Sequence, residues 1–141
     1  MKISFVAGFG PISPDPQASR RFWVDEMGIE LAGDDNHRAT DELEGIRAYA
    51  VWALSGAAQS CFETDDWPAS VPRPQAWIEF DVESTQAVAE AAAELEERGH
   101  RLLRPAKEEG WGQTVARLLS PEGLLVGISY TPWMHVQTDS D

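Results

Sequence analysis

The feature that most constrains the fold of this chain is a diverged internal repeat. Residues 16–31 (PQASRRFWVDEMGIEL) resemble residues 85–102 (TQAVAEAAAELEERGHRL). Three matches follow in order: Gln17-Ala18 with Gln86-Ala87 at an offset of 69, Gly28 with Gly99 at 71, and Glu44-Gly45 with Glu122-Gly123 at 78. The offset grows only where loops are expected, which indicates one structural unit used twice.

The second copy shows the unit most clearly. Residues 77–82 (WIEFDV) alternate, so a strand would place Ile78, Phe80 and Val82 on one face and Trp77, Glu79 and Asp81 on the other. A helix is predicted from Ser84 or Thr85 to Gly99, with a buried stripe of Val88, Ala91 or Ala92, and Leu95. Three further strands are expected at about 101–104, 113–119 and 124–130.

The first copy has the same order of elements. A glycine-rich strand (ISFVAGFGPIS) precedes a helix with Asp15 as N-cap and Pro16 in its first turn. This helix should end at Gly28 and bury Ala18, Phe22, Trp23 and Met27. Strands are expected at about 29–33, 37–42 and 46–53, followed by a short helix and a Pro-rich linker.

These elements predict an α+β fold with two βαβββ modules forming a curved cleft. The expected organisation is a single domain, 1–141, with module one at 1–54, a linker at 55–75, module two at 76–133 and a short tail at 134–141.

Composition limits the partners and the setting. The formal net charge of −13 argues against nucleic acid and favours cationic small molecules, although acidity also simply serves solubility. No run approaches 18 apolar residues, so no membrane span is expected. The single cysteine, Cys61, excludes an internal disulfide, is expected to be buried and structural, and favours a cytoplasmic setting.

Three stretches give the chain a family resemblance: GFGPISPDPQASRRFWVDEMGIEL, WIEFDVESTQAVAEAAAELEERGHRLL and WGQTVARLLSPEGLLVGISY. They resemble the vicinal oxygen chelate superfamily, which includes glyoxalase I, extradiol dioxygenases and bleomycin resistance proteins. The resemblance implies paired βαβββ modules around a cleft, often completed by a homodimer. In the enzymes a divalent metal sits in that cleft, held by residues on the first and last strands of each module.

The metal positions that the resemblance implies carry unsuitable residues here. They fall on Gly8, Tyr49, Trp77 and Gly127, whereas such metals need several His or carboxylate ligands. The histidines lack ligand spacing and are expected to be solvated: His37, His100 and His135. We therefore expect no metal and no other cofactor.

The leading hypothesis is a metal-free small-molecule binding protein that resembles the bleomycin resistance proteins. Its expected site is aromatic and acidic and suits a cationic aromatic compound; the expected ligand-binding residues are Tyr49, Trp67, Trp77, Glu79, Trp111 and Arg117. No catalytic residue is assigned. One alternative is an enzyme with a relocated metal site or metal-free acid–base chemistry at Glu79 or Asp81. The other alternative is a module that binds a partner protein.

Overall fold

The computed structural model describes residues 1–135, so residues 136–141 of the expected tail lie outside the described part. The elements follow one another in this order: β1 (Phe5–Ser13), α1 (Pro16–Arg20), the π-helix η1 (Arg21–Glu26), β2 (Ala32–Gly33), β3 (His37–Thr40), β4 (Tyr49–Ala53), α2 (Leu54–Phe62), β5 (Ala76–Asp81), α3 (Thr85–Glu97), β6 (Arg104–Glu108), β7 (Thr114–Leu119), β8 (Leu125–Tyr130) and the 3₁₀-helix η2 (Pro132–Met134). The βαβββ order therefore occurs twice, as predicted, and α2 follows the first unit.

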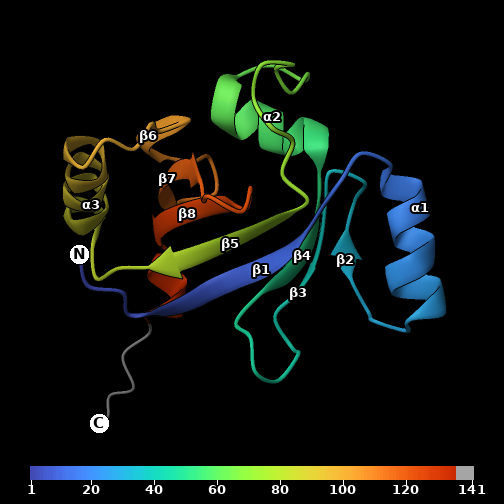
Figure 1. The fold of residues 1–141 in the computed structure, drawn as a ribbon. Helices are drawn as coiled ribbons and strands as arrows, with labels where there is room; N and C mark the ends of the chain where they lie inside the picture. The colour runs from blue at the N-terminus through green and yellow to red at the C-terminus, as the bar shows by residue number, and fades with distance from the viewer. Residues whose placement is uncertain (136–141) are drawn as a thin grey trace, which may run out of the picture.

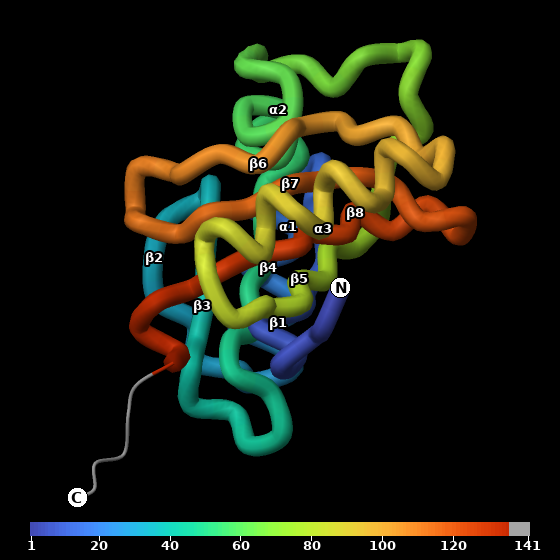
Figure 2. The backbone as a smooth tube through the Cα atoms, turned by 90° about the vertical axis from the view of Figure 1, so that its left-hand side faces the viewer, coloured from blue at the N-terminus to red at the C-terminus, as the bar shows by residue number. Residues whose placement is uncertain are grey.

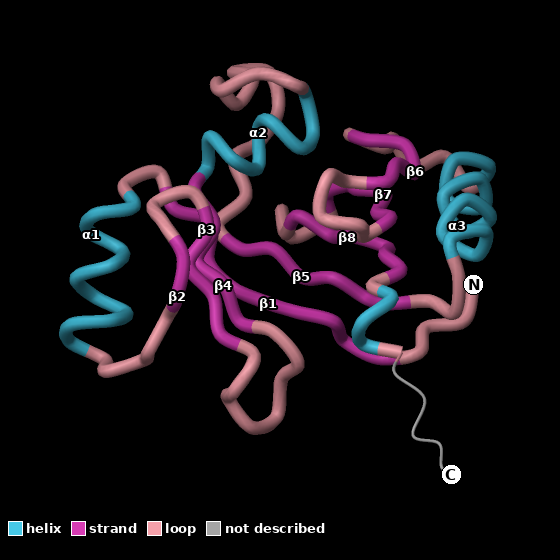
Figure 3. The backbone as a smooth tube through the Cα atoms, turned by 180° about the vertical axis from the view of Figure 1, so that it is seen from behind, coloured by secondary structure: helices cyan, strands magenta, loops and turns pink. Residues whose placement is uncertain are grey.

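All eight strands form one curved sheet in the order β2-β3-β4-β1-β5-β8-β7-β6. The two units meet at its centre, where β1 and β5 pair antiparallel. Helices α1 and α3 stand outside its two ends, as Figure 3 shows from behind, and α2 rises above both halves in Figures 1 and 2. This arrangement confirms the predicted fold class. Among residues 1–135, no helix combines the length and apolar character needed to cross a bilayer.

The central strand pairing agrees with the repeat seen in the sequence. Phe9 pairs with Ile78, Gly8 with Glu79, and Gly10 with Trp77. The offset of 69 residues makes Ile78 the counterpart of Phe9, so each of these two residues lies opposite its own duplicate. The two units are thus related by a pseudo-twofold axis through the Phe9–Ile78 pair.

The sheet has two distinct faces. The outer face packs against α3, where Val88, Ala91 and Ala92 are buried together with Ile128 of β8. The inner face carries Trp77 and is covered by α2. There Trp77 joins a core cluster with residues of β4, α2 and the following segment: Ala50, Trp52, Ala57, Ala58, Cys61 and Trp67. The inner face is therefore filled largely by the chain's own α2 segment.

The first helical segment departs from its predicted packing. No residue of α1 or η1 is buried, and Phe22 and Met27 are 46% and 55% exposed, so their predicted burial is wrong. The cause is the π-helical turn, in which the Met27 N–H bonds the Phe22 carbonyl oxygen at 2.9 Å, five residues back. This wider turn removes the 3.6-residue spacing on which the predicted stripe depended.

Candidate functional site

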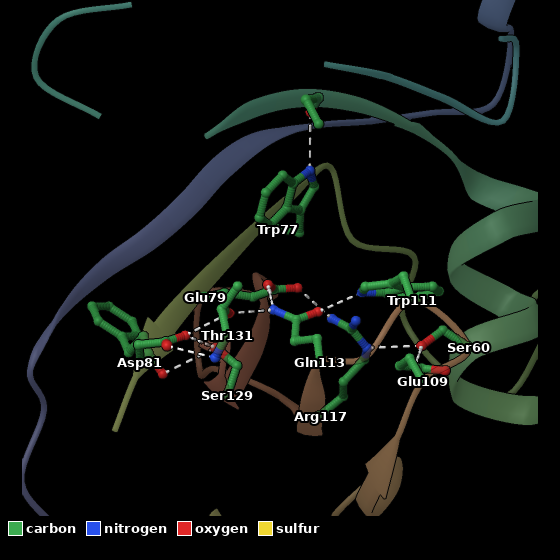
Figure 4. Close-up of polar contacts among 12 residues, drawn as sticks. Ser60, Trp77, Glu79, Asp81, Glu109, Trp111, Gln113, Arg117, Ser129 and Thr131 are labelled. Carbon is green, nitrogen blue, oxygen red and sulfur yellow. Dashed lines mark hydrogen bonds and ion pairs between the residues drawn. The ribbon is translucent and has the colours of Figure 1, made fainter. Parts of the chain in front are cut away.

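A buried ion pair forms the centre of the inner face (Figure 4). The Arg117 Nη1 of β7 lies 2.9 Å from the Glu79 Oε2 of β5. Arg117 is only 1% exposed and Glu79 is also buried. A buried arginine needs a carboxylate partner, and β5 supplies one because Glu79 shares the inner face with Trp77. The anionic cleft expected from the sequence is therefore electrically balanced at this point.

A chain of hydrogen bonds through the side-chain amide of Gln113 links this ion pair to the surface. The Gln113 Nε2 donates to the Glu79 Oε1 at 2.9 Å and to the Thr131 Oγ1 at 3.0 Å. The Trp111 Nε1 donates to the Gln113 Oε1 at 3.0 Å, although the Trp111 side chain is largely exposed. Trp111 therefore forms the solvent-exposed end of this chain of hydrogen bonds.

Helix α2 joins the same cluster from above. The Arg117 Nε donates to the Ser60 Oγ at 2.9 Å, and this hydroxyl donates in turn to the Glu109 Oε2 at 2.8 Å. The guanidinium carbon of Arg117 lies 4.9 Å from the centre of the Trp52 ring. Sequence reasoning missed Ser60 and Glu109, because their contacts span 57 and 49 residues and carry no local pattern.

Asp81, the second inner-face carboxylate, is fully buried and accepts four hydrogen bonds. Ser129 Oγ and Thr131 Oγ1 donate to its Oδ1 at 2.7 and 2.9 Å, and the Thr131 N–H donates to its Oδ2 at 2.7 Å. The His135 Nε2 lies 2.7 Å from the same Oδ2, so the prediction that His135 is merely solvated is wrong. Asp81 thus fastens the end of β8 and the segment after it to β5.

The six residues predicted to bind a ligand fall into three groups. Trp77, Glu79 and Arg117 all lie on the inner face, where Glu79 and Arg117 pair, and Trp111 is linked to Glu79 through Gln113. Trp67, within the linker, is buried in the same apolar core as Trp77, and its Nε1 donates to the Val71 and Pro72 carbonyl oxygens at 3.0 and 3.1 Å. Tyr49 lies elsewhere and packs against Trp23 of η1 with ring centroids 5.9 Å apart.

The placement of Tyr49 corrects the expected pairing of the two last strands. Tyr49 of β4 pairs with Phe9 of β1, whereas Val126 of β8 pairs with Ile78 of β5. The counterpart of Gly127 is therefore Ala50. The turn glycines mislead because Gly45 lies four residues before β4 but Gly123 only two before β8. A slip of one residue turns a strand's side chains to the opposite face.

With this correction, the four inner-face metal positions implied by the family resemblance hold Gly8, Ala50, Trp77 and Gly127. The Trp77 indole fills much of this space: its Nε1 donates to the Ala50 carbonyl oxygen at 3.0 Å, and a Cβ on Gly8 would lie 2.7 Å from its Cη2. Among residues 1–135, no three His, Cys, Asp or Glu residues are grouped to hold an ion. The residues present do not fit the metal of the related enzymes.

The Cys61 thiol lies in the core of the inner face, next to Ser60, whereas two surface hollows lie elsewhere. Burial raises the pKa of the Cys61 thiol to about 11, so the thiol stays protonated at neutral pH. Two hollows of about 460 Å³ each open on the surface. One lies between η1 and strands β2 and β3 and has a rim that includes Glu30, Asp41 and Glu42; the other lies beside Ser13, Trp67 and Arg73.

Comparison with solved structures gives the same architecture. A glyoxalase/bleomycin resistance protein/dioxygenase superfamily member from Vibrio splendidus 12B01 has a TM-score of 0.55 and 16% identity, over 92% of this chain and all of that one. A variant of Streptomyces coelicolor methylmalonyl-CoA epimerase, in complex with 2-nitronate-propionyl-CoA, has a TM-score of 0.56 and 14% identity, over 96% of this chain and all of that one. At such low identity these similarities show the fold alone.

Comparison with sequences adds the family. No curated protein matches the chain significantly. The model of the Glyoxalase/Bleomycin resistance protein/Dioxygenase superfamily, however, matches residues 9–128, which include β4, β5 and the Glu79–Arg117 pair. The chain therefore belongs to the Glyoxalase/Bleomycin resistance protein/Dioxygenase superfamily.

Proposed function

We propose that this protein binds a small molecule without a metal ion, at the open end of the inner-face cluster. The observation that carries the proposal is the hydrogen-bonded path from the buried Glu79–Arg117 pair through Gln113 to the exposed indole of Trp111. An exposed tryptophan that is held by a buried polar group offers a fixed stacking surface with hydrogen-bonding groups behind it.

The charges around Trp111 favour a cationic ligand. Glu79 and Arg117 balance each other, which leaves the half-buried carboxylate of Glu109 beside the same loop. The chain as a whole carries a formal charge of −13, which raises the local concentration of cations. We therefore propose a cationic compound with a flat aromatic part, which would stack on Trp111 through contacts of about 0.5–2 kcal/mol.

The proposed assembly is a homodimer. Its support is the apolar surface formed by Phe22 of η1 and by Met27 directly after it, whose side chains are 46% and 55% exposed. The matching helix of the second unit, α3, instead buries its apolar stripe. The Phe22 ring makes an edge-to-face contact with Trp23, and the Trp23 ring makes one with Tyr49 on β4. The aromatic surface therefore extends from η1 to the sheet. A second copy of the chain would cover this surface.

The test of ligand binding is fluorescence titration of the full chain with cationic aromatic compounds and with anionic aromatic compounds of matched size. We expect saturable quenching by cationic compounds, a loss of most of that quenching in Trp111→Phe, and retention in Trp23→Phe, whose ring lies by Tyr49. If no cationic compound binds, or if both variants respond alike, the proposed site is wrong. Mass spectrometry of the bound compound provides a further readout, because its conversion to a product would favour the enzyme alternative.

A further inference from the structure

We propose that the guanidinium of Arg117 is a resident cation of the inner face, standing in for the divalent metal of the enzymes in this superfamily. The inference goes beyond ligand binding, and neither depends on the other. It explains why the metal positions are lost while a charged centre persists on the same face.

The position of the guanidinium supports this assignment. A Cβ on Gly127 would lie 3.4 Å from the Arg117 Nη1, so the cation lies directly over one of the four metal positions. Its charge partner, Glu79, lies on the first strand of the second unit, two residues after Trp77. The Trp52 ring under the guanidinium lies on the last strand of the first unit, two residues after Ala50. Both units therefore contribute to the surroundings of this cation.

The glycines at the lost metal positions have a steric explanation. A Cβ on Gly127 would lie 2.7 Å from the Glu79 Cγ and 3.1 Å from the Val115 Cγ2. A Cβ on Gly8 would meet the Trp77 ring at 2.7 and 2.9 Å. A side chain at either position would thus collide with the groups that now occupy the inner face. We therefore infer that glycine at positions 8 and 127 accompanies the Trp77 ring and the Glu79–Arg117 pair, which fill the space of the metal site.

Two of the three guanidinium nitrogens have hydrogen-bond acceptors on the inner face. Ser60 accepts from its Nε, Glu79 accepts from its Nη1, and Gln113 holds the other Glu79 oxygen. An arginine stays protonated at any accessible pH, so this positive charge cannot be stripped by a chelator or lost by dilution. The buried Glu79 carboxylate consequently has a permanent counter-charge.

The first part of the test uses the unmodified chain. After incubation with Mn²⁺, Ni²⁺ or Zn²⁺ and desalting, we expect far less than one ion per chain by mass spectrometry of the metals. We also expect the same melting temperature with and without EDTA. Retention of about one ion per chain, or a melting temperature that EDTA lowers, would overturn the proposal.

The second part removes the cation. Arg117→Ala leaves the Glu79 carboxylate without its counter-charge, so the melting temperature should fall and should rise again on addition of methylguanidinium or one of the divalent ions. The control is the double variant Arg117→Met with Glu79→Gln, which has neither charge and should not respond. If Arg117→Ala folds but ignores every added cation, or if the control responds equally, the assignment is wrong. If Arg117→Ala does not fold, Arg117→Lys, which keeps a cation, should melt above Arg117→Gln, and the reverse order would refute the proposal.

These outcomes can be separated from those of the ligand titration. Failure to bind any aromatic cation leaves the metal content and the melting temperatures unaffected. A stoichiometric metal, in contrast, would refute the resident cation whatever the chain binds.

Discussion

Gly8 and Trp77 should be energetically coupled, and a double-mutant cycle can measure the coupling. A Cβ at position 8 would lie 2.7 Å from the Trp77 Cη2 and 2.9 Å from its Cζ3, closer than side-chain atoms can approach. The ring is buried and its Nε1 is bonded to the Ala50 carbonyl oxygen, so it has little room to shift. The cycle consists of Gly8→Ala, Trp77→Phe and the variant with both changes.

The expected energies follow from these contacts. Gly8→Ala inserts one methyl group into a packed region and should lower the free energy of unfolding by about 1–3 kcal/mol. Trp77→Phe loses the indole hydrogen bond, at about 1–3 kcal/mol, and also removes the outer ring atoms that the new methyl group would strike. Part of the Gly8→Ala cost should remain, because the Ala48 carbonyl oxygen would still lie 3.1 Å from the methyl carbon. We therefore expect a coupling of about 1–2 kcal/mol, with the double variant more stable than the sum of the single changes predicts.

Urea unfolding followed by far-UV circular dichroism is the suitable assay, since it does not depend on the fluorescence of the replaced tryptophan. The control is Gly110→Ala, because a Cβ at that exposed position would have no atom within 4 Å. It should change stability by less than about 0.5 kcal/mol and add independently to Trp77→Phe. If Gly8→Ala and Trp77→Phe are also additive within about 0.5 kcal/mol, the inferred packing of the indole against β1 is wrong.

Three further outcomes are expected. The Cys61 thiol should react with a disulfide reagent at pH 8 only when the chain unfolds. Because folding raises its pKa from 9.0 to about 11, the free energy of unfolding should fall as the pH rises across that range, and this fall should be absent in Cys61→Ala. Asp81→Asn replaces a charged acceptor of four hydrogen bonds and should cost at least about 2 kcal/mol in urea unfolding, whereas the exposed Asp35→Asn should cost less than about 1 kcal/mol. Replacing Phe22 and Met27 by Asp should shift sedimentation towards the monomer without lowering the melting temperature of the monomer; an unchanged mass would contradict the proposed dimer surface.

The second unit was the more predictable because its local patterns agree with its long-range packing. The alternation over residues 77–82 placed Trp77 and Glu79 on one face, and the apolar spacing from Thr85 onward predicted α3 with Val88 buried. The first unit lacks this agreement. Nothing in the spacing of Phe22 and Met27 announces the π-helical turn that leaves both side chains exposed.

The site was predicted only in part, for a different reason. Strand parity groups Glu79 with Trp77 and Asp81, because each strand has a single alternating pattern, whereas the register of β7 on β8 brings Arg117 to the same face. It does not reveal that α2 folds over that face and presents Ser60 to the guanidinium. The Tyr49 error shows the same limit: the distance from a turn glycine to its strand differs between the two units, and only the sheet register shows it.

The pairing of Phe9 with Ile78 has a consequence for the origin of such a chain. A residue that lies opposite its own duplicate is what two separate copies of one short unit would produce when they associate about a twofold axis. A half-length ancestor with a single βαβββ unit could therefore have built the same eight-stranded sheet as a dimer of identical subunits. The segment that now joins β4 to β5 makes this association intramolecular, so the sheet no longer depends on protein concentration and the two halves became free to diverge.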